Sequence, residues 1–282
     1  MYFVQETDKL NGICNLLNLV KLDNNKILLP VLIGEEISEK KSKKMAEKTK
    51  KILDKCICNK LIISKNIKKI ENYINYLHSY NIKIVDGKWL FQVLSSEAIE
   101  YVVNKRKLKK EDTEISILVN DLTEILLENI KQIIRKYKKV NIVTNHSEKF
   151  KNIEKKILEE EGIIIAINNN KRKSLSKSKI ILNADFPTEL INKYTIFDEA
   201  IIINLRGNVK INKKRFNGIN INDYEIQYTD TTNFDEIDKK MYDLKDIYEA
   251  NIYHKQPFKN IQTRLKINNV QIKQLIGNNI NL

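Results

Sequence analysis

Apolar runs alternate with helical apolar periodicities through the middle of the chain. Short runs rich in Ile and Val occupy residues 115–119, 140–144, 163–167, 180–184 and 200–205. Segments 122–137 and 148–161 instead space their apolar residues three and four apart, as an amphipathic helix does. Gly162 follows the second segment, where a glycine commonly ends a helix. Continuous Ile and Val runs are typical of strands covered on both faces. This order predicts a parallel sheet with right-handed crossovers, a Rossmann-like α/β domain.

The first 112 residues show a similar alternation and predict a separate N-terminal α/β domain. Strands are expected at residues 2–5, 26–33, 60–64 and 82–87, and helices at 35–56, 67–80 and 88–106. Pro30 interrupts the second of these strands. Because proline cannot donate to a strand ladder, this strand is expected at a sheet edge or at a bulge.

A charged segment at residues 105–114 provides the best domain boundary. We therefore expect an N-terminal α/β domain at 1–112, a Rossmann-like domain at 113–228 and a C-terminal helical segment at 229–282. Within 206–226 we expect loops with one or two short strands. Apolar spacing predicts a helix over 234–252 and another over 258–267, whereas 270–276 fits either a helix or a strand.

Composition narrows the class of protein. Hydrophobic residues make up 42% of the 282 residues, enough for a substantial core. The net charge of +14 fits a nucleic-acid partner or a Lys-rich solvated surface, and the helices mix Lys with Glu. Abundant Lys, Asn and Ile are typical of proteins from AT-rich genomes.

Cys14, Cys56 and Cys58 form no CxxC pair, no signal peptide is evident and no apolar run is long enough for a membrane span. We expect a cytoplasmic protein with buried thiols and no membrane partner.

Polar residues begin where the apolar strands of the Rossmann-like domain stop. Open parallel sheets bind ligands outside the carboxyl ends of their strands. The candidate cofactor-binding residues are therefore Asn120, Asp121, Thr144, Asn145, His146, Asn183 and Asp185. The same residue types are favoured in ordinary turns, so a purely structural role is the alternative. His146 is either a general base or phosphate contact, or a surface imidazole that begins a helix.

The motif evidence does not assign a cofactor. A dinucleotide fingerprint needs GxGxxG at the first strand–helix turn, whereas residues 119–124 contain no glycine. The side chains of Asn120 and Asp121 would crowd a diphosphate there. No P-loop, GxSxG or HExxH motif and no metal-ligand spacing occurs, so no catalytic residue or metal site is assigned. NAD or NADP would have to bind in an unusual pose.

Two basic segments each follow a predicted strand and form a candidate anion or nucleic-acid surface. Their residues are Lys171, Arg172 and Lys173 in the first, and Lys213, Lys214 and Arg215 in the second. Aromatic residues, on which single-stranded bases stack, are sparse there, and only Phe216 is close.

The order of parts resembles the two-domain architecture of shikimate dehydrogenase and glutamyl-tRNA reductase. That resemblance implies an α/β domain, a helix crossing to a Rossmann domain, and C-terminal helices that return to the first domain. The Gly-rich turn of those families is missing at 119–124, and none of their catalytic residues matches a position here.

Three hypotheses for the function remain. The first and favoured one is a non-catalytic or regulatory protein with a degenerate Rossmann-like domain. The others are an NAD(P)- or nucleotide-dependent oxidoreductase and a basic nucleic-acid-binding accessory protein.

Overall fold

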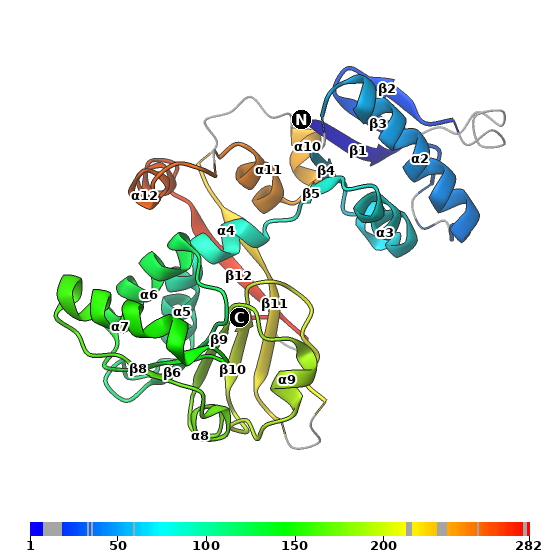
Figure 1. The fold of residues 1–282 in the computed structure, drawn as a ribbon. Helices are drawn as coiled ribbons and strands as arrows, with labels where there is room; N and C mark the ends of the chain where they lie inside the picture. The colour runs from blue at the N-terminus through cyan, green and yellow to red at the C-terminus, as the bar shows by residue number, and fades with distance from the viewer. Residues whose placement is uncertain are drawn as a thin grey trace. The chain divides into compact units, whose positions relative to one another are not determined.

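The computed structural model describes residues 1–7, 19–32, 34, 36–58, 60–212, 216–229, 236–252, 254–278 and 281–282. Contacts between residues divide the chain into two units (Figure 1). The N-terminal unit contains residues 1–87 and 230–254, and the Rossmann-like unit contains residues 88–229 and 255–282. This division differs from the predicted boundaries, because residues 88–112 group with the second unit and the C-terminal segment is shared between both.

The N-terminal unit is built on a five-stranded sheet. In spatial order its strands are β2 (Lys21–Asp23), β3 (Lys26–Leu29), β1 (Tyr2–Glu6), β4 (Lys60–Ile63) and β5 (Lys83–Val85). The pair β2–β3 is antiparallel and the other pairs are parallel. The prediction of an edge strand at Pro30 is wrong. β3 lies between β2 and β1, and it ends at Leu29, so Pro30 interrupts no ladder.

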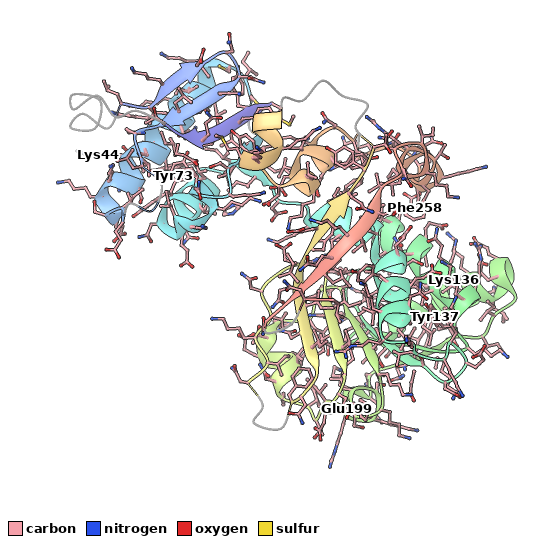
Figure 2. The ribbon with its side chains drawn as sticks, turned by 180° about the vertical axis from the view of Figure 1, so that it is seen from behind. Lys44, Tyr73, Lys136, Tyr137, Glu199 and Phe258 are labelled. Carbon is pink, nitrogen blue, oxygen red and sulfur yellow. The ribbon has the colours of Figure 1, made fainter. Side chains whose placement is uncertain are left out.

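The described residues of the N-terminal unit also form α2 (Glu39–Lys55), the 3-10 turn η1 (Ile67–Lys69), α3 (Glu71–Ser79), α10 (Glu236–Met241) and α11 (Leu244–Ala250). Tyr73 of α3, labelled in Figure 2, is fully buried. Its hydroxyl shares a hydrogen bond with the Thr49 hydroxyl of α2. The predicted helix over 234–252 is broken between α10 and α11. At the break Tyr242 leaves the helical path, donates a hydrogen bond to Gln5 and packs edge-on against Phe3.

The Rossmann-like unit contains a seven-stranded sheet. In spatial order its strands are β12 (Gln271–Gly277), β11 (Ile219–Gln227), β10 (Ile201–Asn204), β9 (Ile180–Asn183), β6 (Glu114–Leu118), β7 (Lys139–Val143) and β8 (Ala166–Asn168). Only β12 runs antiparallel to its neighbour among these strands. Numbered within the unit, the parallel strands follow the order 3-2-1-4-5-6, which is the Rossmann order. The predicted fold class is therefore confirmed, and the ambiguous segment 270–276 is a strand.

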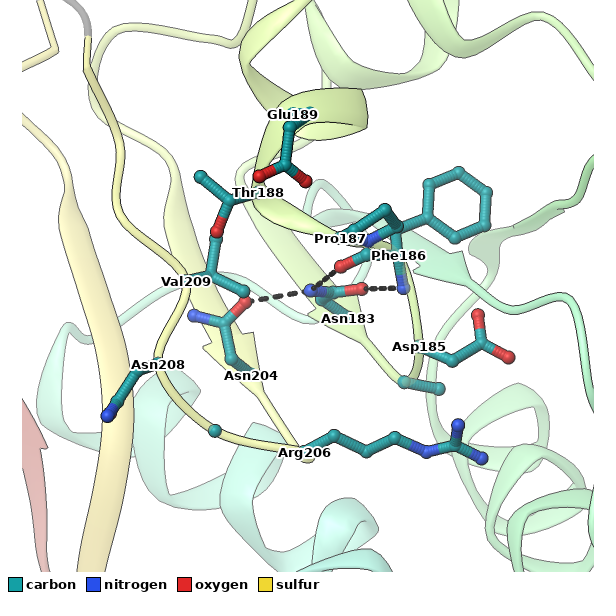
Figure 3. A pocket seen from close by; sticks show the side chains of 12 residues that line it. Asn183, Asp185, Phe186, Pro187, Thr188, Glu189, Asn204, Arg206, Asn208 and Val209 are labelled. Carbon is teal, nitrogen blue, oxygen red and sulfur yellow. Dashed lines mark hydrogen bonds between the residues drawn. The ribbon is translucent and has the colours of Figure 1, made fainter. Parts of the chain in front are cut away.

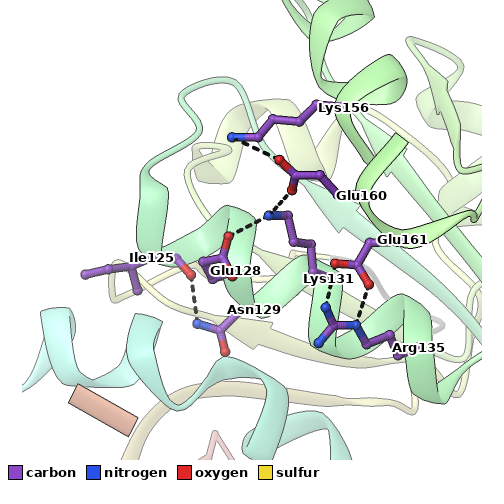
Figure 4. Close-up of polar contacts among 8 residues, drawn as sticks. All are labelled: Ile125, Glu128, Asn129, Lys131, Arg135, Lys156, Glu160 and Glu161. Atoms are coloured by element: carbon purple, nitrogen blue, oxygen red, sulfur yellow. Dashed lines mark hydrogen bonds and ion pairs between the residues drawn. The ribbon is translucent and has the colours of Figure 1, made fainter. Parts of the chain in front are cut away.

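The helices of the Rossmann-like unit are α4 (Lys88–Val93), α5 (Ser95–Lys105), α6 (Glu124–Lys136), α7 (Ser147–Glu161), α8 (Lys171–Leu175), α9 (Thr188–Asn192) and α12 (Phe258–Ile267). Ion pairs join α6 to α7: Lys131 contacts Glu160 at 2.6 Å, and Arg135 forms a two-pronged pair with Glu161 (Figure 4). α7 ends at Gly162, whose φ of 67° is left-handed, as predicted. Within the described ranges, no helix is long and apolar enough to cross a bilayer.

Candidate ligand site at the carboxyl edge of the Rossmann-like sheet

The strand order reverses between β6 and β9, which are hydrogen-bonded neighbours. The chain continues from β6 to β7 on one side and from β9 to β10 on the other. Asn120 and Asp121 follow β6, and Asp185 follows β9. The Asp185 carboxylate accepts the backbone N–H of Asn120 at 2.9 Å and that of Asp121 at 2.7 Å. A protein carboxylate therefore lies at the switch point, bound to the backbone of the first strand–helix turn.

Three backbone donors in this turn and at the start of α6 are already bound by protein side chains. In dinucleotide-binding folds the backbone N–H groups of the first turn and the start of the following helix face the diphosphate. Here Asp185 binds two of those groups, and the Thr123 side chain caps α6 by accepting the N–H of Leu126 at 3.2 Å. Asp121 and Glu124 add two more negative side chains to the same turn. The local charge would repel a diphosphate.

The candidate residues after β7 are held by turn contacts. Asn145 donates its backbone N–H to the Asn120 side chain at 2.9 Å, which links the turns after β6 and β7. The buried Thr144 hydroxyl accepts the backbone N–H of His146 at 3.1 Å. His146 precedes α7 and its side chain is exposed and makes no capping bond. The structure thus brings Asn120, Asp121, Asn145 and Asp185 together through backbone-to-side-chain bonds.

Buried asparagines form a ladder across β9, β10 and β11. Asn183 donates to the Asn204 side chain at 2.9 Å and binds both backbone groups of Phe186. Asn204 in turn donates to Asn220 at 2.8 Å and to Asn222 at 3.0 Å. Buried amides need such partners, because an unpaired buried polar group is costly. Asn183 is therefore engaged within the protein. Sequence reasoning missed the ladder, although its signal was present: Asn183 and Asn204 end β9 and β10, and Asn220 and Asn222 lie in the first half of β11.

A cavity of about 330 Å³ lies beside the switch point, between the turn after β9 and the turn after β10. Figure 3 shows Glu189 and Arg206 on opposite sides of it. Both side chains are exposed, and neither has an ion-pair partner among the described residues. The remaining lining comes from Asn183, Ala184, Asp185, Phe186, Pro187, Thr188, Asn204, Gly207, Asn208 and Val209.

Only part of the basic segment after β8 is exposed to solvent. Lys171 is 8% exposed, and its ammonium group donates to the carbonyl of Asn169 at 3.2 Å. Burial lowers the pKa of Lys171. Arg172 and Lys173 are exposed on α8. Residues 213–215, the second predicted cluster of Lys213, Lys214 and Arg215, lie outside the described residues.

Metal ligands do not cluster in the part of the chain that the structure describes: no group of three or more His, Cys, Asp or Glu there is arranged to hold a metal ion.

No protein-family model matches the chain, and no curated protein matches it. Similar solved structures include the A chain of dipicolinate synthase from Bacillus subtilis, at 8% identity and a TM-score of 0.32 over 62% of this chain and 56% of that one. L-Tryptophan dehydrogenase from Nostoc punctiforme is 10% identical, with a TM-score of 0.29 over 67% of this chain and 52% of that one. Ornithine carbamoyltransferase from Pyrococcus furiosus is 9% identical, with a TM-score of 0.27 and 71% of each chain covered.

The match spans about half the length of the first two of these proteins. Likenesses this distant carry no functional argument. The topology itself defines the class: this is an α/β protein with a Rossmann-like unit.

Proposed function

We propose that the chain is a non-catalytic, regulatory protein whose Rossmann-like unit binds no dinucleotide in the usual pose. The observation that carries the proposal is the Asp185 carboxylate on the backbone N–H groups of Asn120 and Asp121. A diphosphate would have to displace this carboxylate and then lie next to it. Repulsion between the two anions at contact distance makes that exchange unfavourable.

The resemblance to shikimate dehydrogenase and glutamyl-tRNA reductase belongs to this proposal as a shared order of parts. An α/β unit precedes the Rossmann-like unit here, and α10 and α11 return to the first unit. The Gly-rich turn and the catalytic residues of those families have no counterparts in this sequence. We therefore propose that this chain keeps the architecture as a scaffold and does not carry out the reactions of those families.

The regulatory ligand would bind in the cavity beside the switch point. Its two unpaired charges, Arg206 and Glu189, favour a small molecule that carries both an anionic and a cationic group, such as a free amino acid. A carboxylate would bind the Arg206 guanidinium through paired hydrogen bonds. An ammonium group would bind toward Glu189.

Thermal unfolding with added nucleotides tests the first part of the proposal. We expect no saturable change in the unfolding midpoint with NAD, NADP or adenine nucleotides near millimolar concentration, with sodium pyrophosphate as the ionic control. A ligand at 100 times its dissociation constant would add about 2.7 kcal/mol of stability. A saturable rise with NAD or NADP would contradict the proposal and favour the oxidoreductase hypothesis.

The same assay with a panel of amino acids tests the ligand site. We expect at least one amino acid to raise the midpoint, and Arg206→Gln to abolish the rise. Lys210→Gln is the matched control, because Lys210 is exposed nearby but does not line the cavity. An equal response in the two variants would remove the cavity from the proposal.

A further inference from the structure

A second cavity lies in the N-terminal unit, at the switch point of its own sheet. β1 is followed in the chain by β2 and β3 on one side, whereas β4 is followed by β5 on the other. The crevice between the carboxyl ends of β1 and β4 is therefore where a parallel sheet places a ligand. A cavity of about 280 Å³ is found there, lined by Glu6, Val31, Leu32, Gly34, Asn66, Ile67, Lys69 and Ile70.

Glu6 is the unusual member of this lining. It ends β1 and is only 4% exposed. Ser64 donates its hydroxyl to one carboxylate oxygen at 2.6 Å, and Asn66 donates its side-chain amide to the other at 2.6 Å. Both partners are neutral. No Lys or Arg nitrogen in the described part of the chain lies within ion-pair distance of Glu6.

Buried carboxylates are normally paired with a cation or a metal ion. A carboxylate has about four lone-pair positions, and the two neutral donors of Glu6 use two of them. The free positions belong to a residue that lines a cavity. Aliphatic side chains of Val31, Leu32, Ile67 and Ile70 make up much of the remaining lining, together with Gly34, Asn66 and Lys69. The ammonium group of Lys69 lies beyond ion-pair distance of Glu6, so the carboxylate is open to a cation from outside the protein.

We propose that this cavity binds a small organic ammonium compound, with its cationic group on Glu6 and its hydrocarbon part against the aliphatic lining. Ser64 and Asn66 act as positioning residues that fix the carboxylate toward the ligand. This site is in the other unit from the proposed regulatory site and does not depend on it. The failure of one assignment leaves the other untouched.

Isopentylammonium chloride is a suitable probe, with isopentanol and sodium isovalerate as compounds of the same hydrocarbon body. Binding is followed by ligand-detected NMR and by thermal unfolding of the full chain at constant ionic strength. We expect saturable binding of the ammonium compound, with about tenfold or greater preference over the alcohol, and no binding of the carboxylate. Absence of saturable ammonium binding, or equal binding of ammonium compound and alcohol, would overturn the proposal.

Two variants locate the binding. Glu6→Gln keeps the side-chain shape and should remove the preference for the ammonium compound, whereas Glu47→Gln on the exposed face of α2 should not. Leu32→Trp should fill the cavity mouth and block binding without altering the carboxylate, with Leu22→Trp on β2 as its control. If Glu6→Gln fails to fold, the comparison of Leu32→Trp with Leu22→Trp still shows whether the compound binds in this cavity. Unchanged binding in Leu32→Trp or in folded Glu6→Gln would overturn the assignment.

Discussion

Ile57 is held in a conformation that a β-branched residue rarely adopts. Its φ is 50° and its side chain is 96% exposed. It follows α2 in a tight C-terminal turn, in which the N–H of Cys58 bonds the carbonyl of Leu53 at 3.1 Å. Helices usually place glycine at this position, because a left-handed residue with a Cβ is strained by roughly 1–2 kcal/mol.

We predict that Ile57→Gly raises the free energy of unfolding of the N-terminal unit by about 0.5–1 kcal/mol, after the extra chain entropy of glycine is subtracted. Urea denaturation measures the change. Ile164→Gly is the matched control, since Ile164 is also strongly exposed, at 81%, but has no positive φ. Equal effects of the two substitutions would show that lost surface hydrophobicity, rather than backbone strain, explains the result.

Asp246 of α11 is a buried carboxylate beside the ammonium group of Lys68. Burial raises the pKa of Asp246 to about 7, and the attraction of Lys68 offsets only part of that rise. In the unfolded chain the pKa of an aspartate is about 3.9. The native state therefore keeps a proton that the unfolded chain releases. The stability contributed by this proton is complete below about pH 4 and is lost as the pH rises through 7.

We predict that the free energy of unfolding of Asp246→Asn rises relative to that of the wild type between pH 5 and pH 8. Below the native pKa of Asp246, the difference should grow by up to about 1.4 kcal/mol per pH unit. Denaturation at the two pH values gives the difference. Asp54→Asn, at an exposed residue of α2, should show no such trend. A pH-independent difference for Asp246→Asn would refute the assigned pKa.

At the scale of elements, one side chain explains why the predicted helix over 88–106 is two helices. Asn129 of α6 is buried, accepts the backbone N–H of Ser96 at 3.2 Å and donates to the carbonyl of Gln92 at 3.0 Å. It also donates to the carbonyl of Ile125 in its own helix (Figure 4). The break between α4 and α5 is thus satisfied by α6, a partner that local sequence cannot reveal.

We predict that Asn129→Ala lowers the free energy of unfolding of the Rossmann-like unit by roughly 2–3 kcal/mol, because it leaves buried backbone groups of α4 and α5 unpaired. Asn152→Ala, at an exposed position of α7, should change it by less than about 0.5 kcal/mol. Chemical denaturation followed by the fluorescence of Trp89 on α4 reports on this region. A loss at Asn129 no larger than the loss at Asn152 would contradict the bridging role.

The parts of the fold that local patterns determine could be predicted from the sequence. Four of the Ile and Val runs became parallel strands, and Gly162 ends α7 as expected. The run at 163–167 entered the sheet only at its end, in β8, and the long strand β11 was not predicted. The carboxyl edge was also located, because strand ends are visible in the pattern. The roles of the individual residues at that edge could not be predicted. Asn and Asp are favoured both in turns and in ligand-binding sites, and the contact between Asp185 and Asn120 joins residues that are 65 positions apart.

Other features depended on tertiary contacts in the same way. The sequence pattern placed Pro30 at a sheet edge or a bulge, but the strand ends at Leu29, before the proline. The carboxylate of Glu6 was also overlooked. Its signal was a charged residue at the end of the buried strand β1, and its partners Ser64 and Asn66 are distant in sequence. Side chains that satisfy one another across strands are set by strand order, which the sequence pattern did not supply.

At the scale of the whole molecule, the charge of +14 favours general attraction to nucleic acids. We expect binding to single-stranded RNA to fall steeply with salt. We compare two double variants in RNA binding. Replacing Arg172 and Lys173 by glutamine should weaken binding no more than replacing Lys177 and Lys179, two exposed charges near α8. Salt titrations of the two double variants make the comparison. A much larger loss for the first pair would indicate a specific site on α8.

We propose that an internal carboxylate takes the place of the phosphate at the switch point of the Rossmann-like unit. The most direct measurement follows the backbone amide NMR signals of Asn120 and Asp121 during titration with NAD. We expect neither signal to move at millimolar NAD in the wild-type protein, because the Asp185 carboxylate accepts both N–H groups. Saturable movement of both signals in the wild-type protein would contradict it and would show that a dinucleotide reaches this turn.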